Sequence, residues 1–452
     1  PPCGDNMKKL SFKKGWFPMD GLAFDGKLDF PREPVLEVFS PREILLPMLQ
    51  HIGEPAEPIV KVGEKVTVGQ MIGRSSGPLS VPVHTGISGT VTGIKQYELL
   101  NRKHCMAVEI TNDHKRTLHT SIQRREKPER LTPSVISKLL DFSGIVGMGG
   151  EGYPTAKKCV RAYQEGVSTL IVNACQSEPY LSGDIHLLRE QLDRVIRGAG
   201  ALSGLCKVSN VVFCVMDKWL IELEALRDAF AHFQTVYPDR KFIVRVMRSR
   251  FPQGYERLLI KALYNVELPA GRRPENTVGA VVFNVSTCAA VADMVERNMP
   301  LVQRIISISG DTTQGHNMLV PIGSYADEIL ARVPGAASAN RIVMGGAITG
   351  ACLTNAHVPI IKTTQGLALI RKSDPPKTPC VHCGACIDAC PVGLQPYLCH
   401  RLLEVGDEKT VEELGVAQCI SCGACSFVCP AGKDLAFTIS RAGHRARRRG
   451  RS

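Results

Sequence analysis

The sequence has few aromatic residues and no long hydrophobic segment. Phe, Trp and Tyr make up 6% of its 452 residues, and no apolar run reaches the roughly 18 residues that a membrane-spanning helix needs. The N-terminus, Pro1 to Leu10, lacks the apolar core of a secretory signal peptide, so we expect a cytoplasmic protein. Stacking residues are scarce and the positive residues are dispersed except at the C-terminus, which argues against nucleic-acid binding.

Positive charge is in excess, with a formal net charge of +12. Such an excess favours an acidic partner, for example a small ferredoxin-like electron carrier, or an anionic membrane surface. A basic surface without a partner is the alternative. The Arg-rich tail at 441–452 is predicted to be solvated and disordered, with binding to lipid headgroups or to an acidic neighbour as the alternative.

Two cysteine motifs near the C-terminus carry the strongest chemical signal. Each has the spacing C-x2-C-x2-C-x3-C-P, first from Cys380 to Pro391 and again from Cys419 to Pro430. This is the ligand run of two-cluster ferredoxins, in which the fourth cysteine of each run ligates the other cluster. We therefore expect two [4Fe–4S] clusters. Their ligand sets are Cys380, Cys383, Cys386 and Cys429 for one cluster, and Cys419, Cys422, Cys425 and Cys390 for the other.

Zinc and disulfides are the two alternatives for these cysteines. A zinc ribbon uses paired C-x2-C knuckles and would leave the third and fourth cysteine of each run surplus. A disulfide framework needs an oxidising compartment, which nothing in the sequence indicates. The cysteines outside the motifs lie mostly in apolar segments of the sequence, as Cys214 does in V-V-F-C-V, and are expected to be reduced, buried thiols.

Changes in pattern along the chain predict a multidomain α/β protein. The expected parts, in chain order, are an irregular N-terminal arm at 1–33, a β module at 34–113, an α/β domain at 132–298, a small α+β module at 300–365, a ferredoxin-like domain at 373–440 and the basic tail at 441–452. A charged linker is predicted between the first two folded parts, and a stiff Pro-rich linker at 373–379.

The α/β domain is expected to hold a mainly parallel sheet. Its strands are the apolar runs at 168–173, 211–215, 242–246 and 279–284, with helices at 184–200 and 217–233 between them. A first helix opens with Thr132 as N-cap and Pro133 at its first position.

A glycine-rich loop inside this domain is the candidate nucleotide site. Four glycines lie within Gly147 to Gly152, which lets backbone N–H groups approach a phosphate or a flat ring. Lys157 and Lys158 follow at the start of a helix, where phosphate binding is favoured. The polar stretch Asn173 to Asp184 follows a strand, at the edge of a parallel sheet where ligands bind. A tight structural turn is the alternative.

These motifs carry a resemblance to a known family. G-x-G-G-x-G-Y-P-T at Gly147–Thr155, followed by N-x4-E-P at Asn173–Pro179, is similar to the flavoprotein subunit of respiratory complex I. The C subunit of the Rnf complex, the membrane ferredoxin:NAD oxidoreductase, is the closer match, over roughly Phe12 to Ile439. The resemblance implies a biotinyl/lipoyl-like hammerhead module, a Rossmann-like domain for FMN and NADH, a β-grasp soluble-ligand-binding (SLBB) module and the ferredoxin-like α domain. Ser75 to Pro82, where carrier modules bear a modified Lys, contains no Lys, so we expect a structural module.

The resemblance also implies roles for individual residues. Those matched to FMN are Gly147, Gly149, Gly150 and Gly152 around the flavin, Lys158 at its phosphate, Asn173 as a hydrogen-bond partner, and Asn284 and Thr287 in the wall N-V-S-T. Two residues are matched to the nucleotide, Tyr153 as the ring that stacks on nicotinamide or adenine and Glu178 as the carboxylate that meets NADH. Gly254 and Glu256 are matched to the later G-x-E segment of the family. Three positions depart from the family pattern, namely Glu151 for a small residue, Gln176 for a carboxylate and Tyr255 for Gly or an acid.

The function implied is oxidation of NADH, or reduction of NAD, at FMN, with single electrons relayed through two clusters. No side chain is expected to act as a catalytic acid or base. The protein would belong to a membrane-associated Rnf-type complex, held at the inner face of the cell membrane only through its partners in that complex. One alternative is a soluble relay that serves a partner reductase of cobalamin or of an amino acid, without efficient NADH oxidation of its own. A scaffold with a decayed flavin site is the other.

Overall fold

The structure, a computed structural model, describes residues 9–11, 37–176, 178–311, 315–371 and 377–449. Most of the predicted N-terminal arm, most of the linker predicted at 373–379, and residues 450–452 lie outside these ranges. No helix among the described residues is long and apolar enough to cross a membrane.

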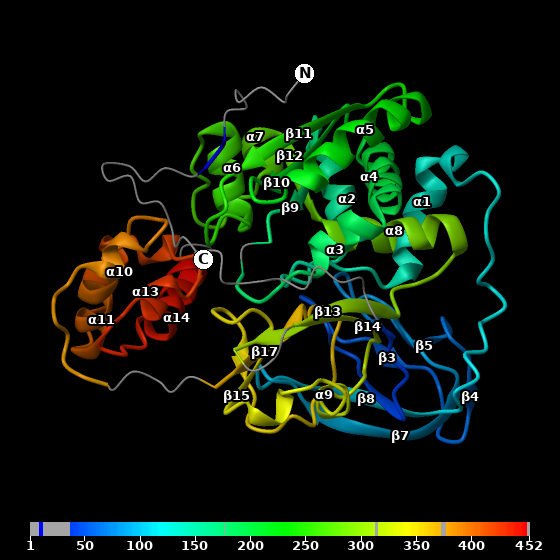
Figure 1. The fold of residues 1–452 in the computed structure, drawn as a ribbon, viewed down its shortest axis with the longest axis horizontal. Coiled ribbons are helices and arrows are strands. Elements are labelled where there is room, and N and C mark those ends of the chain that lie inside the picture. Colours follow the sequence, from blue (N-terminus) through cyan, green and yellow to red (C-terminus); the bar gives the residue numbers. More distant parts are fainter. Residues whose placement is uncertain (1–8, 12–36, 177, 312–314, 372–376, 450–452) are drawn as a thin grey trace.

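The first module is all β and forms two small sheets (Figure 1). One sheet has the order β2-β8-β7-β4 and the other β3-β5-β6. The strands are β2 Glu43–Pro47, β3 Glu57–Pro58, β4 Lys65–Val66, β5 Met71–Arg74, β6 Val83–His84, β7 Gly89–Glu98 and β8 His104–Asn112. Alternating side chains of these strands, such as Ile44 and Leu46, enter the same core as the helices of the next domain.

The α/β domain contains a four-stranded parallel sheet of order β11-β10-β9-β12. Its elements are α1 Pro133–Ser143, α2 Thr155–Gln164, β9 Thr169–Ala174, α3 Gly183–Glu190, α4 Leu192–Cys206, β10 Asn210–Met216, α5 Leu220–Val236, β11 Lys241–Met247, α6 Glu256–Tyr264, α7 Glu275–Val278, β12 Ala280–Asn284 and α8 Val285–Arg297. All four predicted strands are therefore present, and their parallel pairing is confirmed. Leu10 adds a short parallel bridge to Met247 at the edge of this sheet, so this part of the predicted arm is paired rather than irregular.

Both faces of this sheet are covered, which explains its continuous apolar strands. Leu170 and Val172 of β9 face the core shared with α1, α2, α4 and α8, whereas Ile171 faces Leu259 and Ile260 of α6. Helix α1 begins as the sequence predicted, because Thr132 accepts a hydrogen bond from the Val135 N–H group.

The prediction of one helix over 184–200 was wrong. The chain forms two helices, α3 and α4, which break at Gln191, where φ is −138°. The break lets α3 end on α5 through an ion pair of Arg189 with Glu222, while α4 packs along α8.

A six-stranded mixed sheet of order β1-β14-β13-β17-β15-β16 follows. Its elements are β1 Glu37–Val38, β13 Gln303–Gly310, β14 His316–Pro321, α9 Ala326–Leu330, β15 Arg341–Met344, β16 Ala351–Cys352 and β17 Gly366–Ile370. The predicted bounds of 300–365 were too narrow, because β17 completes the sheet beyond residue 365 and β1 joins it from the N-terminal side. The β-grasp assignment of this module stays a prediction.

The C-terminal domain is small and helical, and lies to one side of the rest (Figure 1). Its helices are α10 Ala385–Asp388, α11 Pro396–Glu404, α12 Glu408–Glu413, α13 Ala424–Phe427 and α14 Leu435–Arg449. The prediction of a disordered tail from residue 441 was wrong as far as Arg449. Helix α14 runs through this boundary because Arg445 and Arg449 pair with Glu408 of α12, and Arg449 pairs also with Glu412.

Candidate functional site

The glycine-rich loop between α1 and α2 forms a narrow neck with an exposed tip. Its neck is closed by two backbone bonds, from Gly147 N–H to Tyr153 O (2.8 Å) and from Gly152 N–H to Gly147 O (3.0 Å). Gly149, Gly150 and Glu151 form the exposed tip. Within the described part of the chain, no group accepts a hydrogen bond from the N–H groups of these three residues. The tip therefore offers free donors of the kind that bind an anion or a ring carbonyl.

Two other modules hold this loop from behind. Arg304 of β13 is buried and donates to the carbonyls of Lys362 and of Met148, the latter at 3.3 Å. The Ile52 N–H group of the first module donates to Gly152 O at 3.0 Å. Gly152 has a φ of +72°, and a Cβ there would lie 2.7 Å from the methyl group of Thr363. Only glycine fits this close approach without displacement of the neighbours.

Polar side chains at the carboxyl ends of β9 and β12 border the loop. Asn173 donates to Gly254 O at 2.8 Å, and Thr287 accepts from the Met148 N–H group at 3.0 Å. Asn284 lies beside Gly149, whose Cβ would be 3.4 Å from the Asn284 Cβ. The structure thus brings together Asn173, Gly254, Asn284, Thr287 and the glycine loop at one edge of the sheet.

Asp184 is a site residue that sequence reasoning did not single out. Its carboxylate accepts from the Asn284 amide and from the Ser286 hydroxyl, both at 2.6 Å. Burial raises the pKa of Asp184, although these bonds oppose the shift. Gln176, which was expected to depart from the family pattern, accepts from the Asp184 N–H group at 3.1 Å. Gln176 thus helps to place Asp184, and the only sequence signal was the polar stretch that contains both residues.

A chain of alternating charges lies at the α2 side of the loop. Lys158 pairs with Glu256 at 3.0 Å and lies 5.7 Å from the centre of the Phe283 ring. Burial opposes the charged form of Lys158, but the carboxylates of Glu256, Glu151 and Glu275 outweigh it and raise the pKa of Lys158. Lys158 is therefore cationic and held in place, as a phosphate ligand needs to be.

Tyr153 has neighbours that the sequence did not predict. Its ring lies 4.8 Å from the Arg161 guanidinium and 5.3 Å from that of Arg273. Arg161 pairs with the buried carboxylate of Glu275 at 2.7 Å. These contacts orient the Tyr153 ring beside the loop, and leave its predicted stacking on a nucleotide as a prediction.

Glu178, matched above to a carboxylate that meets NADH, contacts another part of the chain. It accepts from the Ile348 N–H group at 3.2 Å and from the Thr349 hydroxyl. Burial raises the pKa of Glu178. A Cβ on Gly346 would lie 2.2 Å from the Glu178 carboxyl carbon, so the turn before β16 closes tightly on this side chain.

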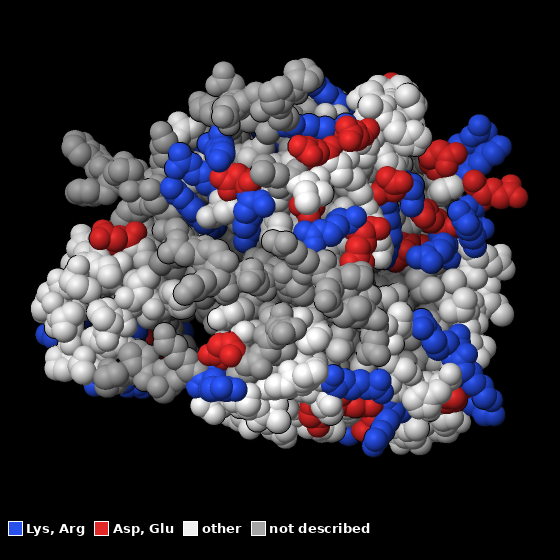
Figure 2. Space-filling model, in the orientation of Figure 1, with Lys and Arg blue, Asp and Glu red and all other residues white. Residues whose placement is uncertain are grey.

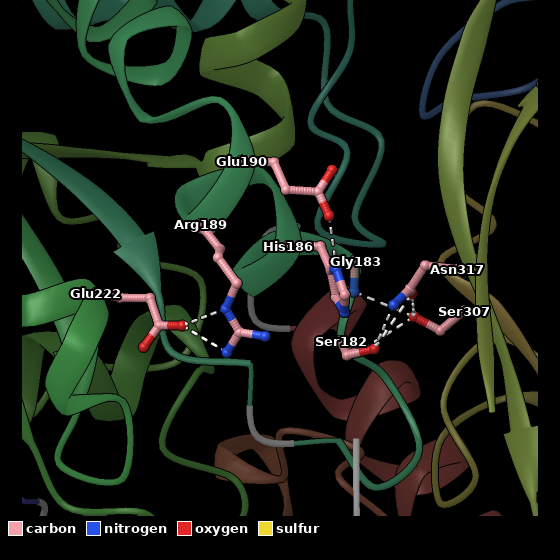
Figure 3. A network of polar contacts seen from close by, with 8 residues as sticks. All are labelled: Ser182, Gly183, His186, Arg189, Glu190, Glu222, Ser307 and Asn317. Atoms are coloured by element: carbon pink, nitrogen blue, oxygen red, sulfur yellow. Dashed lines mark hydrogen bonds and ion pairs between the residues drawn. The ribbon is translucent and has the colours of Figure 1, made fainter. Parts of the chain in front are cut away.

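Polar contacts tie α3 and the residue before it to the mixed sheet and to α5 (Figure 3). The Ser182 N–H group donates to the Ser307 hydroxyl at 2.9 Å, and Ser182 and Asn317 exchange a side-chain hydrogen bond. Arg189 pairs with Glu222 at 2.6 Å, farther along α3. The start of α3, and with it Asp184, is therefore fixed by a neighbouring module.

The eight motif cysteines surround two cavities in the C-terminal domain. One cavity, of about 140 Å³, is lined by Cys380, Cys383, Cys386 and Cys429, here called the Cys380 site. A smaller one is lined by Cys390, Cys419, Cys422 and Cys425, here called the Cys390 site. Within the described residues, no three His, Cys, Asp or Glu side chains lie close enough together to hold a single metal ion.

The two cysteine loops have the same backbone geometry. His382 N–H points to the Cys380 sulfur and Ser421 N–H to the Cys419 sulfur, both at 3.4 Å. Both His382 and Ser421 have positive φ, near 55° and 58°. N–H groups directed at sulfur stabilise thiolates that carry cluster charge, so the donor set fits two iron–sulfur clusters.

Charge is unevenly spread over the surface (Figure 2). Positive and negative side chains are mixed over the α/β domain, whereas the visible face of the C-terminal domain carries few of either sign. In that domain the basic residues gather on α14, where several are paired with α12.

Three family models match parts of the chain. They are the Nuo51 FMN-binding domain at residues 140–293, the RnfC barrel sandwich hybrid domain at 21–115 and a 4Fe-4S dicluster domain at 379–433. These matches support the barrel-like β module, the FMN-binding type of α/β domain and the iron–sulfur type of C-terminal domain.

Several characterised proteins are similar over most of the chain. The C subunit of the proton-translocating ferredoxin:NAD(+) oxidoreductase complex of Clostridium ljungdahlii is 31% identical, over 86% of this chain and 83% of that protein. The C subunit of the Na(+)-translocating complex of Acetobacterium woodii is also 31% identical, over 86% and 87%. Among solved structures, an NAD+-reducing [NiFe]-hydrogenase has the same fold over 71% of this chain and 62% of its own, with a TM-score of 0.53 and 18% identity.

Proposed function

This chain belongs to the family of C subunits of ion-translocating ferredoxin:NAD oxidoreductase complexes, and from that premise we propose how its site works. It is an oxidoreductase subunit for electron transfer. We propose that it oxidises NADH, or reduces NAD, at FMN, and that it relays electrons one at a time through two [4Fe–4S] clusters.

The observation that carries this proposal is the grouping of the eight cysteines. Residues far apart in sequence, such as Cys386 and Cys429, line one cavity, while Cys390 lines the other with the second motif. Such interleaving is what two cubane clusters require and what a pair of separate knuckles does not. The Cys380 site and the Cys390 site are therefore proposed to hold one cluster each.

FMN is proposed to bind at the tip of the glycine-rich loop. The free N–H groups of Gly149, Gly150 and Glu151 would meet it there, with Lys158 at its phosphate and Asn173 at its ring. When bound, FMN supplies a ring that takes up both electrons of a hydride and releases them singly. The protein would orient the ring, because the backbone of the loop is held by Arg304.

Partners and location follow from the family. The other subunits of such a complex are the proposed partners, together with NADH and a ferredoxin-like electron carrier. Attachment to the inner face of the membrane would run through those subunits. The mixed sheet built around β13 and β17 is proposed to be the β-grasp module of the family.

Anaerobic reconstitution followed by an NADH titration tests the proposal. Two four-iron clusters predict about eight irons, about eight sulfides and one FMN per chain. NADH should bleach the flavin absorbance under nitrogen. A protein that binds zinc in place of iron, or whose flavin does not bleach, would contradict it.

A second function is favoured by the contacts of Glu178. Its carboxylate is already engaged in hydrogen bonds from the Ile348 N–H group and the Thr349 hydroxyl. The chain would then be a relay that passes electrons from a carrier to a partner reductase, with FMN and clusters but little NADH oxidation. Flavin that is reduced by a ferredoxin-like carrier and not by NADH would select this function.

A further inference from the structure

One short segment of the α/β domain touches both the candidate flavin pocket and the Cys390 site. Phe251 and Tyr255 pack in an apolar cluster with Cys422 and Ala424 of the C-terminal domain. Ile348 belongs to the same cluster, and a Cβ on Gly423 would lie 2.7 Å from its Cγ2 atom. Cys422 of the Cys390 site is thus buried against the α/β domain, with 8% of its surface exposed.

Arginine side chains also stabilise this contact between the α/β domain and the second cysteine loop. Arg257 donates to the Gln418 carbonyl at 2.9 Å and to its side chain, directly before Cys419. From the other side, Arg447 of α14 donates to the Cys419 carbonyl at 2.9 Å. The backbone of the second cysteine loop is therefore held between an arginine of each domain.

The residues between these contacts belong to the flavin pocket. Gly254 O accepts from Asn173 at 2.8 Å, and Glu256 pairs with Lys158 at 3.0 Å. Tyr255 lies between them in sequence, and its side chain is close to Thr349 and Glu178. Consecutive residues thus alternate between the pocket and the Cys390 site.

Among the described residues, the lining of the Cys380 site includes none from the α/β domain. All residues that line its cavity lie between 380 and 435, within the C-terminal domain. Cys383 is exposed, and Val381 at the rim is 62% exposed. The rim of this site is therefore accessible to a partner.

We propose that Tyr255 and Arg257 are positioning residues that hold the Cys390 site against the flavin pocket, so that this site is the first to receive electrons and the Cys380 site the second. The inference rests on the proposed function. Oxidation of one NADH to NAD+ releases one proton and two electrons, and the two clusters take up one electron each.

Freeze-quench electron paramagnetic resonance on the reconstituted chain tests the order. Mixing with NADH should give the signal of the Cys390 site first. Cys422→Ser and Cys383→Ser assign the two signals, since each variant alters only one. Tyr255→Ala and Arg257→Gln should delay the first signal by about tenfold or more, because a misplacement of roughly 1 Å can cost up to about 100-fold. Tyr255→Phe and Arg257→Lys should restore most of the rate.

Matched controls separate positioning from folding. Tyr163→Phe on α2 and Arg401→Gln on α11 change exposed residues far from the contact and should leave the order and rate unchanged. Reduction by dithionite, which needs no pocket, should be equal in all variants of full iron content. Loss of iron in both Tyr255→Ala and Arg257→Gln would overturn the inference, since the residues would then serve folding.

The outcomes also distinguish this inference from the function on which it rests. Flavin that does not bleach with NADH removes the proposed function. Two other results would contradict only the proposed order of the clusters. In both the flavin bleaches with NADH, but either the Cys380 signal rises first, or Tyr255→Ala and Arg257→Gln keep the wild-type rate.

Discussion

Lys362 is a buried amine at the junction of three modules, and its replacement by Met gives a pH-dependent prediction. Its side chain is 1% exposed, and its Nζ donates to Pro82 O and Gly144 O, both at 2.8 Å. No carboxylate among the described residues pairs with it. The neighbouring His84 and His51 have pKa values lowered by burial to about 3 and about 4, and are neutral at pH 7.

Burial lowers the pKa of Lys362 from 10.5 to about 7. Between these values the unfolded chain holds a proton that the folded chain lacks, so the free energy of unfolding rises with pH. The free energy of unfolding rises by up to about 1.4 kcal/mol per pH unit, and by about 5 kcal/mol in total between the folded and unfolded pKa values of Lys362. Below pH 7 the amine is charged in both states, and this contribution to the slope disappears.

Lys362→Met removes this slope and both hydrogen bonds. We expect the free energy of unfolding of the wild type, relative to that of the variant, to increase by about 2.5 kcal/mol from pH 7.5 to pH 9.5. Over most of this range the increase per pH unit is close to its maximum of about 1.4 kcal/mol. Anaerobic urea denaturation of the holoprotein, followed by circular dichroism at several pH values, measures it. Lys65→Met, at an exposed position, is the control and should show no such growth. A constant difference between wild type and Lys362→Met would refute the reasoning, because Lys362 would then not change its protonation on folding.

Three further predictions concern the flavin pocket. Gly152→Ala should lower the FMN retained after desalting, because the new methyl group meets the Thr363 methyl at 2.7 Å in a backbone with φ of +72°; full retention would contradict the close approach. Asp184→Ala should lower the free energy of unfolding at pH 7 by about 3 kcal/mol in urea denaturation, since it leaves two buried donors without an acceptor, and a loss under about 1 kcal/mol would argue against this account. Lys158→Gln should weaken FMN binding about tenfold or more in a fluorescence titration, as expected for a lost charge-assisted phosphate bond, whereas Lys138→Gln on the exposed face of α1 should not.

Local spacing was enough to predict part of this structure. The four parallel strands and the Thr132 cap follow from patterns a few residues long, and the structure places them as expected. The two predicted cysteine groups each line a cavity, and their role as cluster ligands stays a prediction. The helix over 184–200 was predicted wrongly because periodicity does not reveal a break that tertiary contacts of Arg189 impose. Helix α14 was missed for a similar reason, since its arginines are stabilised by Glu408, 37 to 41 residues away.

The site residues that could not be predicted from the sequence have one feature in common, which is that their contacts are distant along the chain. Arg304 lies 156 residues from Met148, and the Lys362 amine 218 residues from Gly144, so no local pattern could join them. Both are buried basic side chains that donate to backbone carbonyls of the segment around the glycine loop. A glycine-rich loop is favourable for a ligand only if its backbone is held still, because glycine loses more conformational freedom on ordering than any other residue. Neighbouring modules supply this restraint, and the proposed flavin pocket therefore depends on the whole assembly of modules rather than on the α/β domain alone.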